Sequence, residues 1–179
     1  MAGAETPPFV PVRIAVLTVS DTRGPADDRS GDLLAGRLTA AGHLLAARAL
    51  VTDDREAIAA RLRGWIADPE VDVVISTGGT GLTGRDVTVE AHAAVYEKEI
   101  TGFATLFTLI SFQKIGTSAV QSRACAGVAG GTYLFALPGS PSACADAWDG
   151  ILAAQLDLRH RPCNFVEIMP RLEEHRRRK

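Results

Sequence analysis

Three glycines and two threonines fill five consecutive positions of the chain, Thr77, Gly78, Gly79, Thr80 and Gly81. Glycine permits positive φ and lets a ligand approach the backbone closely, and successive free N–H groups form a concave anion site that threonine hydroxyls can extend. A phosphate or a pterin-like heterocycle would suit such a loop. The pattern lacks the Gly-Lys-Ser/Thr of a P-loop and is not G-x-G-x-x-G, and a sharp turn without a ligand accounts for it equally well.

Two aspartates stand where they could hold a divalent cation beside this loop. Asp86 follows Gly81 by five residues, and Mg²⁺ is typically bound by a few carboxylates together with phosphate oxygens and water. Asp53 precedes a helical pattern, and the adjacent Asp54 leaves the functional position open by one residue. Each aspartate could instead be the N-cap of a helix, a common role for Asp. For Asp53 this interpretation has a further sign, because Glu56 three residues later completes a pattern that resembles a capping box.

The elements that must position these residues alternate along the chain. Almost wholly apolar runs are typical of strands buried on both faces, and apolar residues at intervals of three and four indicate helices. We expect strands at residues 13–19, 43–51, 71–76, 121–128 and 132–137, with a hairpin turn at 130–131. We expect helices at about 30–42, 53–66, 87–96, 102–112 and 142–158.

This alternation predicts an α/β fold, a three-layer α/β/α sandwich around a mostly parallel mixed sheet. The expected organisation is an extended tail at 1–11, a single domain at 12–168 and a basic tail at 169–179, whose basic block at 176–179 we interpret as a solvated, frayed end.

Ligands bind such folds beyond the carboxyl ends of the strands, and the polar loops expected there are 20–24, 77–86 and 138–141. The last of these could bind an anion at a helix N-terminus, although turn chemistry with Ser142 as N-cap is the simpler interpretation. Arg123, next to Ser122, could clamp a phosphate or be a solvated surface charge.

Composition excludes several functional classes. The chain is 46% apolar and 22% charged, which is ordinary for a globular domain, and no apolar run approaches the roughly 18 residues of a membrane-spanning helix. Residues 1–11 carry neither a basic residue nor an apolar core, so we expect no signal peptide. The net charge of −2, with one basic block at 176–179, argues against nucleic-acid binding. Three cysteines without zinc or C-x-x-C spacing favour a reducing cytoplasm.

Several separated motifs carry a family resemblance. The stretch VISTGGTG at 74–81 is followed by RDVT at 85–88, and further downstream stand EITGF at 99–103, IGTS at 115–118, QSRA at 121–124, LPGS at 137–140 and RPCNF at 161–165. In this order they resemble the molybdenum-cofactor biosynthesis family that includes MogA and MoaB, and the downstream motifs are similar to its MoaB branch. The resemblance covers about residues 13–165.

The resemblance implies a molybdopterin-binding fold that assembles as a homotrimer, or as a homohexamer in the MoaB branch. Active members transfer an adenylyl group from ATP to molybdopterin with Mg²⁺, which releases pyrophosphate, and a later enzyme inserts molybdate or tungstate. The attacking phosphate is already ionised near neutral pH, so the site must mainly position two anions and neutralise charge. The alternative is a protein of the same pathway that binds or carries molybdopterin without catalysis.

The positions that match the family's two aspartates are Asp53 and Asp86, which the resemblance makes the catalytic and metal-binding carboxylates. We favour Asp53 over Asp54, because Asp54 falls better inside the first helical turn. The resemblance also implies a substrate-binding set of Ser20, Asp21, Thr77, Gly78, Gly79, Thr80, Gly81, Ser122, Arg123, Gly139 and Ser140. The helix expected at 102–112 is apolar on more than one face, which fits either core packing or a subunit interface.

Overall fold

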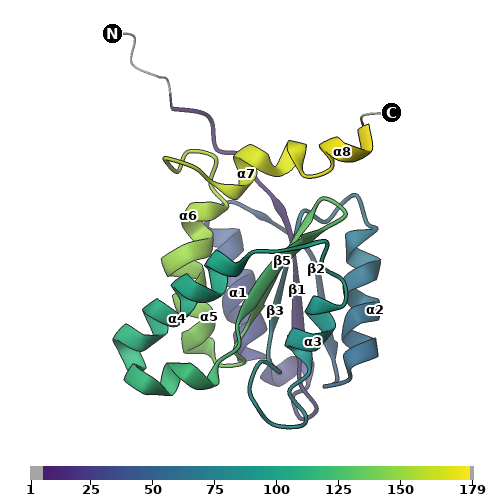
Figure 1. The fold of residues 1–179 in the computed structure, drawn as a ribbon, viewed down its shortest axis with the longest axis vertical. Coiled ribbons are helices and arrows are strands. Elements are labelled where there is room, and N and C mark those ends of the chain that lie inside the picture. Colours follow the sequence, from purple (N-terminus) through teal and green to yellow (C-terminus); the bar gives the residue numbers. More distant parts are fainter. Residues whose placement is uncertain (1–5, 178–179) are drawn as a thin grey trace.

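A mixed sheet of six strands forms the centre of the computed structural model, which describes residues 6–177 (Figure 1). The strand order is β2-β1-β3-β6-β5-β4, and β5 runs antiparallel to both of its neighbours while β2, β1, β3 and β6 are parallel. The strands are β1 (Arg13–Val19), β2 (Leu44–Val51), β3 (Val73–Thr77), β4 (Lys98–Glu99), β5 (Cys125–Ala129) and β6 (Thr132–Leu137).

Helices cover both faces of this sheet, so the predicted three-layer α/β/α sandwich is confirmed (Figure 1). One face carries α1 (Arg29–Ala40), α4 (Thr101–Ile115), α5 (Pro141–Ala147), α6 (Ala153–Gln155) and α7 (Phe165–Ile168). The other face carries α2 (Arg55–Ile66) and α3 (Thr88–Ala93). Further helical segments are the 3₁₀ turns η1 (Pro25–Asp27), η2 (Gly116–Gln121) and η4 (Met169–Arg171), the π-helical η3 (Trp148–Leu152) between α5 and α6, and α8 (Glu174–Arg177).

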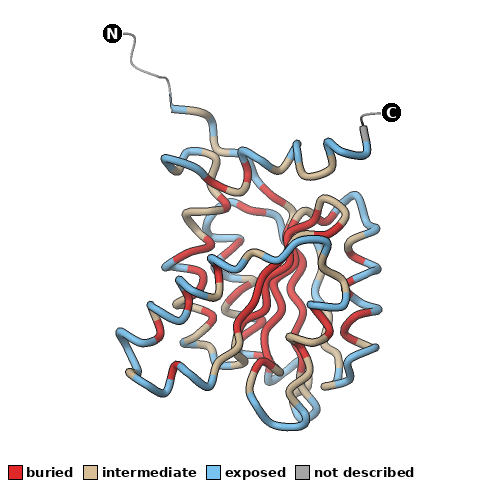
Figure 2. Tube along the Cα trace, viewed as in Figure 1, coloured by how far each residue is buried: buried red, intermediate tan, exposed pale blue. Residues whose placement is uncertain are grey.

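Successive residues of the central strands feed two separate cores. On β1, Ile14 and Val16 pack in the core under α1, whereas Ala15 and Leu17 pack in the core under α2. Because side chains alternate across a strand, a strand covered on both faces must be apolar at nearly every position. Figure 2 shows the central strands as the buried part of the molecule.

The order of the strands places a crevice at the carboxyl ends of the neighbouring strands β1 and β3. The chain leaves β1 through α1 to reach β2 at one edge, whereas it leaves β3 through α3 toward β4 at the opposite edge. Connections that diverge in this way separate the loops at the carboxyl ends of the two strands, which is where open α/β sheets bind ligands.

Each of the five predicted helices starts within one or two residues of its expected position, and at two of them the difference changes which residue is the N-cap. The side chain of Asp54 accepts a hydrogen bond from Ala57 N at 2.7 Å, so Asp54 is the N-cap of α2 and the capping interpretation of Asp53 is wrong. The helix expected at 142–158 begins at Pro141, because Ser140 is its N-cap and accepts from Ala143 N at 3.2 Å. The N-cap expected at Ser142 is therefore wrong as well. Proline at the first helical position fits this register, since its missing N–H would have no helical partner.

Other parts of the structure also differ from the prediction. The strand predicted at 121–128 starts only at Cys125, because residues 116–121 form the 3₁₀ turn η2, and the short strand β4 was not predicted. Within the expected basic tail, Met169 and Leu172 pack against the core. Arg176, the first residue of the block interpreted as frayed, pairs with Glu97 at 2.6 Å. Residues 1–5 and 178–179 of the two expected tails lie outside the described residues. None of the helices described is both long and apolar enough to cross a membrane.

Candidate functional site

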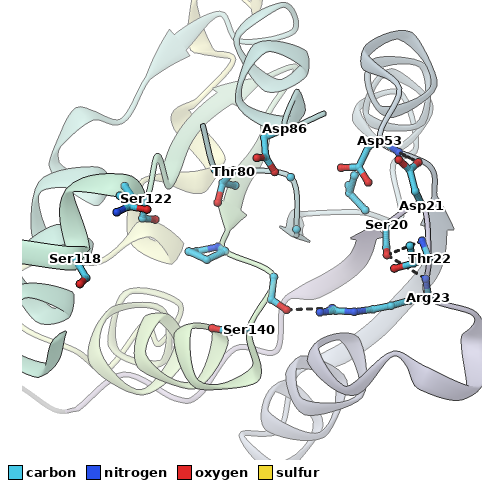
Figure 3. Close-up of a pocket in the computed structure, with 17 residues that line it drawn as sticks. Ser20, Asp21, Thr22, Arg23, Asp53, Thr80, Asp86, Ser118, Ser122 and Ser140 are labelled. Carbon is cyan, nitrogen blue, oxygen red and sulfur yellow. Dashed lines mark hydrogen bonds between the residues drawn. The ribbon is translucent and has the colours of Figure 1, made fainter. Parts of the chain in front are cut away.

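A cleft of about 630 Å³ lies at the carboxyl ends of β1, β3 and β6 (Figure 3). The loops after these three strands form its walls, together with Asp53 after β2 and the turn η2. Most of the residues predicted for the site line this cleft: Ser20, Asp21, Asp53, Gly78, Gly79, Thr80, Gly81, Asp86, Ser122, Gly139 and Ser140. The fold thus brings together segments that stand more than 100 residues apart in the chain.

Main chain forms the floor of the cleft. Gly78 has a φ of +103°, and its N–H donates to the Leu137 carbonyl at 3.0 Å. A Cβ built on Gly78 would lie under 3.0 Å from the Val19 carbonyl oxygen, and one built on Gly139 would lie 3.2 Å from the Gly78 Cα. The ends of β1, β3 and β6 therefore touch through backbone atoms, and glycine is needed for that close approach.

Carboxylates approach the glycine loop on its other side. Gly79 has a φ of +66°, and a Cβ there would lie 2.9 Å from the Asp53 Oδ1. A Cβ on Gly81 would lie 2.7 Å from the Asp86 Oδ2. Thr88 is fully buried behind Gly79, and its hydroxyl finds no hydrogen-bond partner among the described residues. Asp53 and Asp86 thus both border the loop 77–81, although they come from different elements.

The three carboxylates beside the glycine loop differ in how far neighbouring groups stabilise their negative charge. Asp21 pairs with Arg85 and accepts a hydrogen bond from the Asp53 N–H at 3.0 Å, and the Arg85 hydrogen bond lowers the pKa of Asp21. Asp86 accepts from the Thr83 hydroxyl at 2.7 Å and the Thr83 N–H at 2.9 Å, which lowers its pKa. Burial, and then the charge of Asp21, instead raise the pKa of Asp53.

This donor set fits a divalent cation that a phosphate also ligates. Among the described residues the Asp53 carboxylate has no salt-bridge partner, and burial together with the charges of Asp21 and Asp86 raises its pKa. A Mg²⁺ ion would stabilise the ionised form of such a carboxylate, and Mg²⁺ commonly takes only one or two carboxylates plus phosphate oxygens and water.

Comparison with known proteins settles the family. Residues 15–158 match the family described as "Probable molybdopterin binding domain". The chain belongs to this family. Molybdenum cofactor biosynthesis protein B of Escherichia coli K12 is 51% identical over 157 residues, which cover 88% of this chain and 92% of the relative. The Bacillus subtilis protein of the same name is 40% identical over 146 residues, covering 81% and 86%.

Solved structures agree with this assignment. A crystal structure of a molybdenum cofactor biosynthesis protein B matches with a TM-score of 0.83 and 38% identity, over 92% of this chain and 98% of that one. The tungsten cofactor synthesizing protein MoaB from Pyrococcus furiosus matches with a TM-score of 0.72 and 33% identity, over 80% and 91%. The predicted family is confirmed, and the chain is a protein of molybdenum cofactor biosynthesis.

Two residues of the predicted set have partners inside the protein instead of lining the cleft. The Thr77 hydroxyl donates to the Pro138 carbonyl at 2.9 Å, below the floor. In this molybdopterin-binding domain, Arg123 donates from Nε to the Gly81 carbonyl at 2.8 Å and from Nη2 to the Asp86 carbonyl at 3.1 Å, and it pairs with Glu90. Arg123 is therefore not the solvated surface charge considered above; it fixes both ends of the segment 81–86.

Several lining residues were missed by the sequence-based expectation. Arg23 donates from Nη1 to the Gly139 carbonyl at 3.0 Å and lies along the cleft in Figure 3. Ser118 and Gln121 enter the wall from η2, and only the last residue of this segment, Gln121, was expected to belong to a strand. Arg23 could have been found, because it stands in the polar loop 20–24 that was placed at the edge of the sheet. The contribution of η2 had a weaker signal, since Ser118 and Gln121 stand in the family motifs at 115–118 and 121–124 but in no predicted loop of the site.

Proposed function

We propose that this chain catalyses the Mg²⁺-dependent adenylylation of molybdopterin by ATP, yielding adenylyl-molybdopterin and pyrophosphate in the cytoplasm. The observation that carries this proposal is the pair of carboxylates, Asp53 and Asp86, that border one glycine loop in a polar cleft. Membership of a molybdopterin-binding family supports the pterin as one substrate. The carboxylates support a metal-bound nucleotide as the other.

Each part of the cleft has a role in this reaction. Asp53 and Asp86 would hold the metal ion, which when bound would neutralise phosphate charge. In the reaction a phosphate oxygen of molybdopterin bonds to the α-phosphorus of ATP, and the bond from that phosphorus to the departing pyrophosphate breaks. The main chain of residues 79–81 offers N–H groups to a phosphate or the pterin, whereas the Gly78 N–H already donates to the Leu137 carbonyl. The terminal phosphate of molybdopterin is itself the nucleophile and is already ionised near neutral pH. The protein must therefore align this phosphate with ATP and needs no strong base.

An exposed apolar face supports assembly into a homotrimer or homohexamer. Large apolar side chains of α4 and η2 are half exposed or more: Leu106, Leu109, Phe112, Ile115 and Val120. An apolar cluster of this kind marks an association surface more often than a monomer's free surface. It adjoins the η2 residues that line the cleft, and sedimentation of the purified chain would give its oligomeric state. A molybdate-inserting enzyme that takes the adenylylated product is the further partner we propose.

Pyrophosphate release from purified chain, molybdopterin, ATP and Mg²⁺ tests the reaction. Asp53→Asn and Asp86→Asn should each abolish release, because each removes a metal-binding carboxylate. Asp54→Asn is the matched control, since asparagine caps a helix about as well as aspartate and Asp54 caps α2. Pterin-dependent release that persists in Asp86→Asn would overturn the proposal. Molybdopterin binding without any release would instead support a carrier.

A further inference from the structure

The cleft carries one positively charged side chain among its described lining residues. Asp21, Asp53 and Asp86 contribute three carboxylates, whereas Arg23 is the single cation. Both substrates of the proposed reaction are polyanions, and a metal ion bound by the carboxylates can neutralise only the phosphates that reach it. A phosphate elsewhere in the cleft needs another positive group.

Arg23 is held over the floor of the cleft from both ends. Its backbone N–H donates to the Ser20 hydroxyl at 3.1 Å, and its Nη1 donates to the Gly139 carbonyl at 3.0 Å. The Ser30 hydroxyl donates to the same carbonyl at 2.8 Å. The side chain thus spans from the loop after β1 to the loop after β6, and the described residues accept only one bond from its five N–H donors.

The walls of the cleft differ in character. In Figure 3, Asp53 and Asp86 lie along one side, and the Arg23 guanidinium lies along the opposite side near Ser140. One side therefore suits a metal-bound phosphate, whereas the other suits a phosphate that is bound by hydrogen bonds and an arginine.

We propose that Arg23 binds a phosphate group of one substrate through its guanidinium, on the side of the cleft away from Asp53 and Asp86. The inference rests on the proposed function for the identity of the substrates. The phosphate belongs either to molybdopterin or to ATP, and both present the oxygen geometry that a guanidinium matches with two parallel hydrogen bonds.

Equilibrium binding without turnover tests this assignment. The dissociation constants of molybdopterin alone and of ATP with Mg²⁺ are measured separately for wild type, Arg23→Gln and Arg23→Lys. Arg23→Gln should weaken the ligand that Arg23 holds roughly 10- to 100-fold, as expected for lost hydrogen bonds to a charged group. Arg23→Lys should fall between, because it keeps the charge but loses the planar fork. Arg37→Gln is the control, since Arg37 is an exposed residue of α1 that pairs with Asp149.

Salt dependence separates binding from a structural role. Wild-type affinity for that ligand should fall more steeply with ionic strength than the affinity of Arg23→Gln, because one charge contact has been removed. Arg23→Gln binding both ligands within about twofold of wild type, with an unchanged salt slope, would overturn the inference. The proposed function is judged independently by pyrophosphate release. Weakened binding in Arg23→Gln without any wild-type release would uphold the phosphate contact and refute the adenylylation.

Discussion

Gly78→Ala should destabilise the fold by several kcal/mol although it adds one methyl group. Gly78 has a φ of +103°, and left-handed backbone costs an L-residue roughly 1–2 kcal/mol. The new Cβ would also lie under 3.0 Å from the Val19 carbonyl oxygen, which belongs to the end of β1 and cannot rotate away. Overpacking of this kind costs about 1–3 kcal/mol. The two effects together predict a loss of roughly 2–5 kcal/mol.

Urea unfolding at one fixed protein concentration measures this loss, since association would otherwise shift the midpoint. With a slope of about 2 kcal/mol per molar urea, the midpoint of Gly78→Ala should fall by roughly 1–2.5 M. Gly84→Ala is the control in the same loop, because its Cβ meets no atom within 4 Å, and it should stay within about 0.5 kcal/mol of wild type. Equal midpoints for the two variants would refute the idea of a close-packed backbone floor.

Three further variants test charge and positioning. Asp53→Asn should stabilise the fold at pH 7, because burial and the charge of Asp21 raise the pKa of Asp53 and so disfavour its ionised form in the folded protein. The gain in stability should vanish below the ordinary pKa of 3.8, where the Asp53 carboxyl is protonated in the folded and in the unfolded protein. A gain that persists in urea unfolding at pH 3 would contradict this. Burial lowers the pKa of His92 to about 3, so stability should fall below pH 6.5 by up to about 1.4 kcal/mol per pH unit, and His92→Gln should flatten that slope. Arg123→Met should cost about 1–3 kcal/mol and speed hydrogen exchange in residues 81–86, which unchanged protection there would disprove.

The buried strands could be predicted because they are covered on both faces and must be apolar at nearly every position, as in β1. Asp53 was favoured over Asp54 because Asp54 was expected inside the first helical turn, and that premise is wrong, since Asp54 is the N-cap and α2 begins at Arg55. Local pattern cannot decide between the two, because either residue can cap the helix that follows. Tertiary structure separates them: the cap falls to Asp54, and Asp53 is left at the cleft.

Long-range partners explain the other differences. Arg123 contacts carbonyls about 40 positions earlier in the chain, at Gly81 and Asp86, and no local pattern announces such a contact. The Arg23 bond to the Gly139 carbonyl depends likewise on two loops that meet only after the sheet has formed. The loops 20–24, 77–86 and 138–141 lie at the carboxyl ends of strands, as the sequence predicts, whereas the direction of individual side chains within them required the fold.

A cleft whose floor is main chain restricts how its ligand preference can change. Val19, Gly78 and Gly139 meet there through backbone atoms, so replacing a side chain cannot deepen or widen the floor without moving the end of a strand. New selectivity, whether in natural divergence or in laboratory evolution, would therefore have to arise at the rim. Ser118 and Gln121 are the accessible positions, because their short turn lies outside the sheet. A library randomised at these two positions should retain folded protein far more often than one randomised at the glycines.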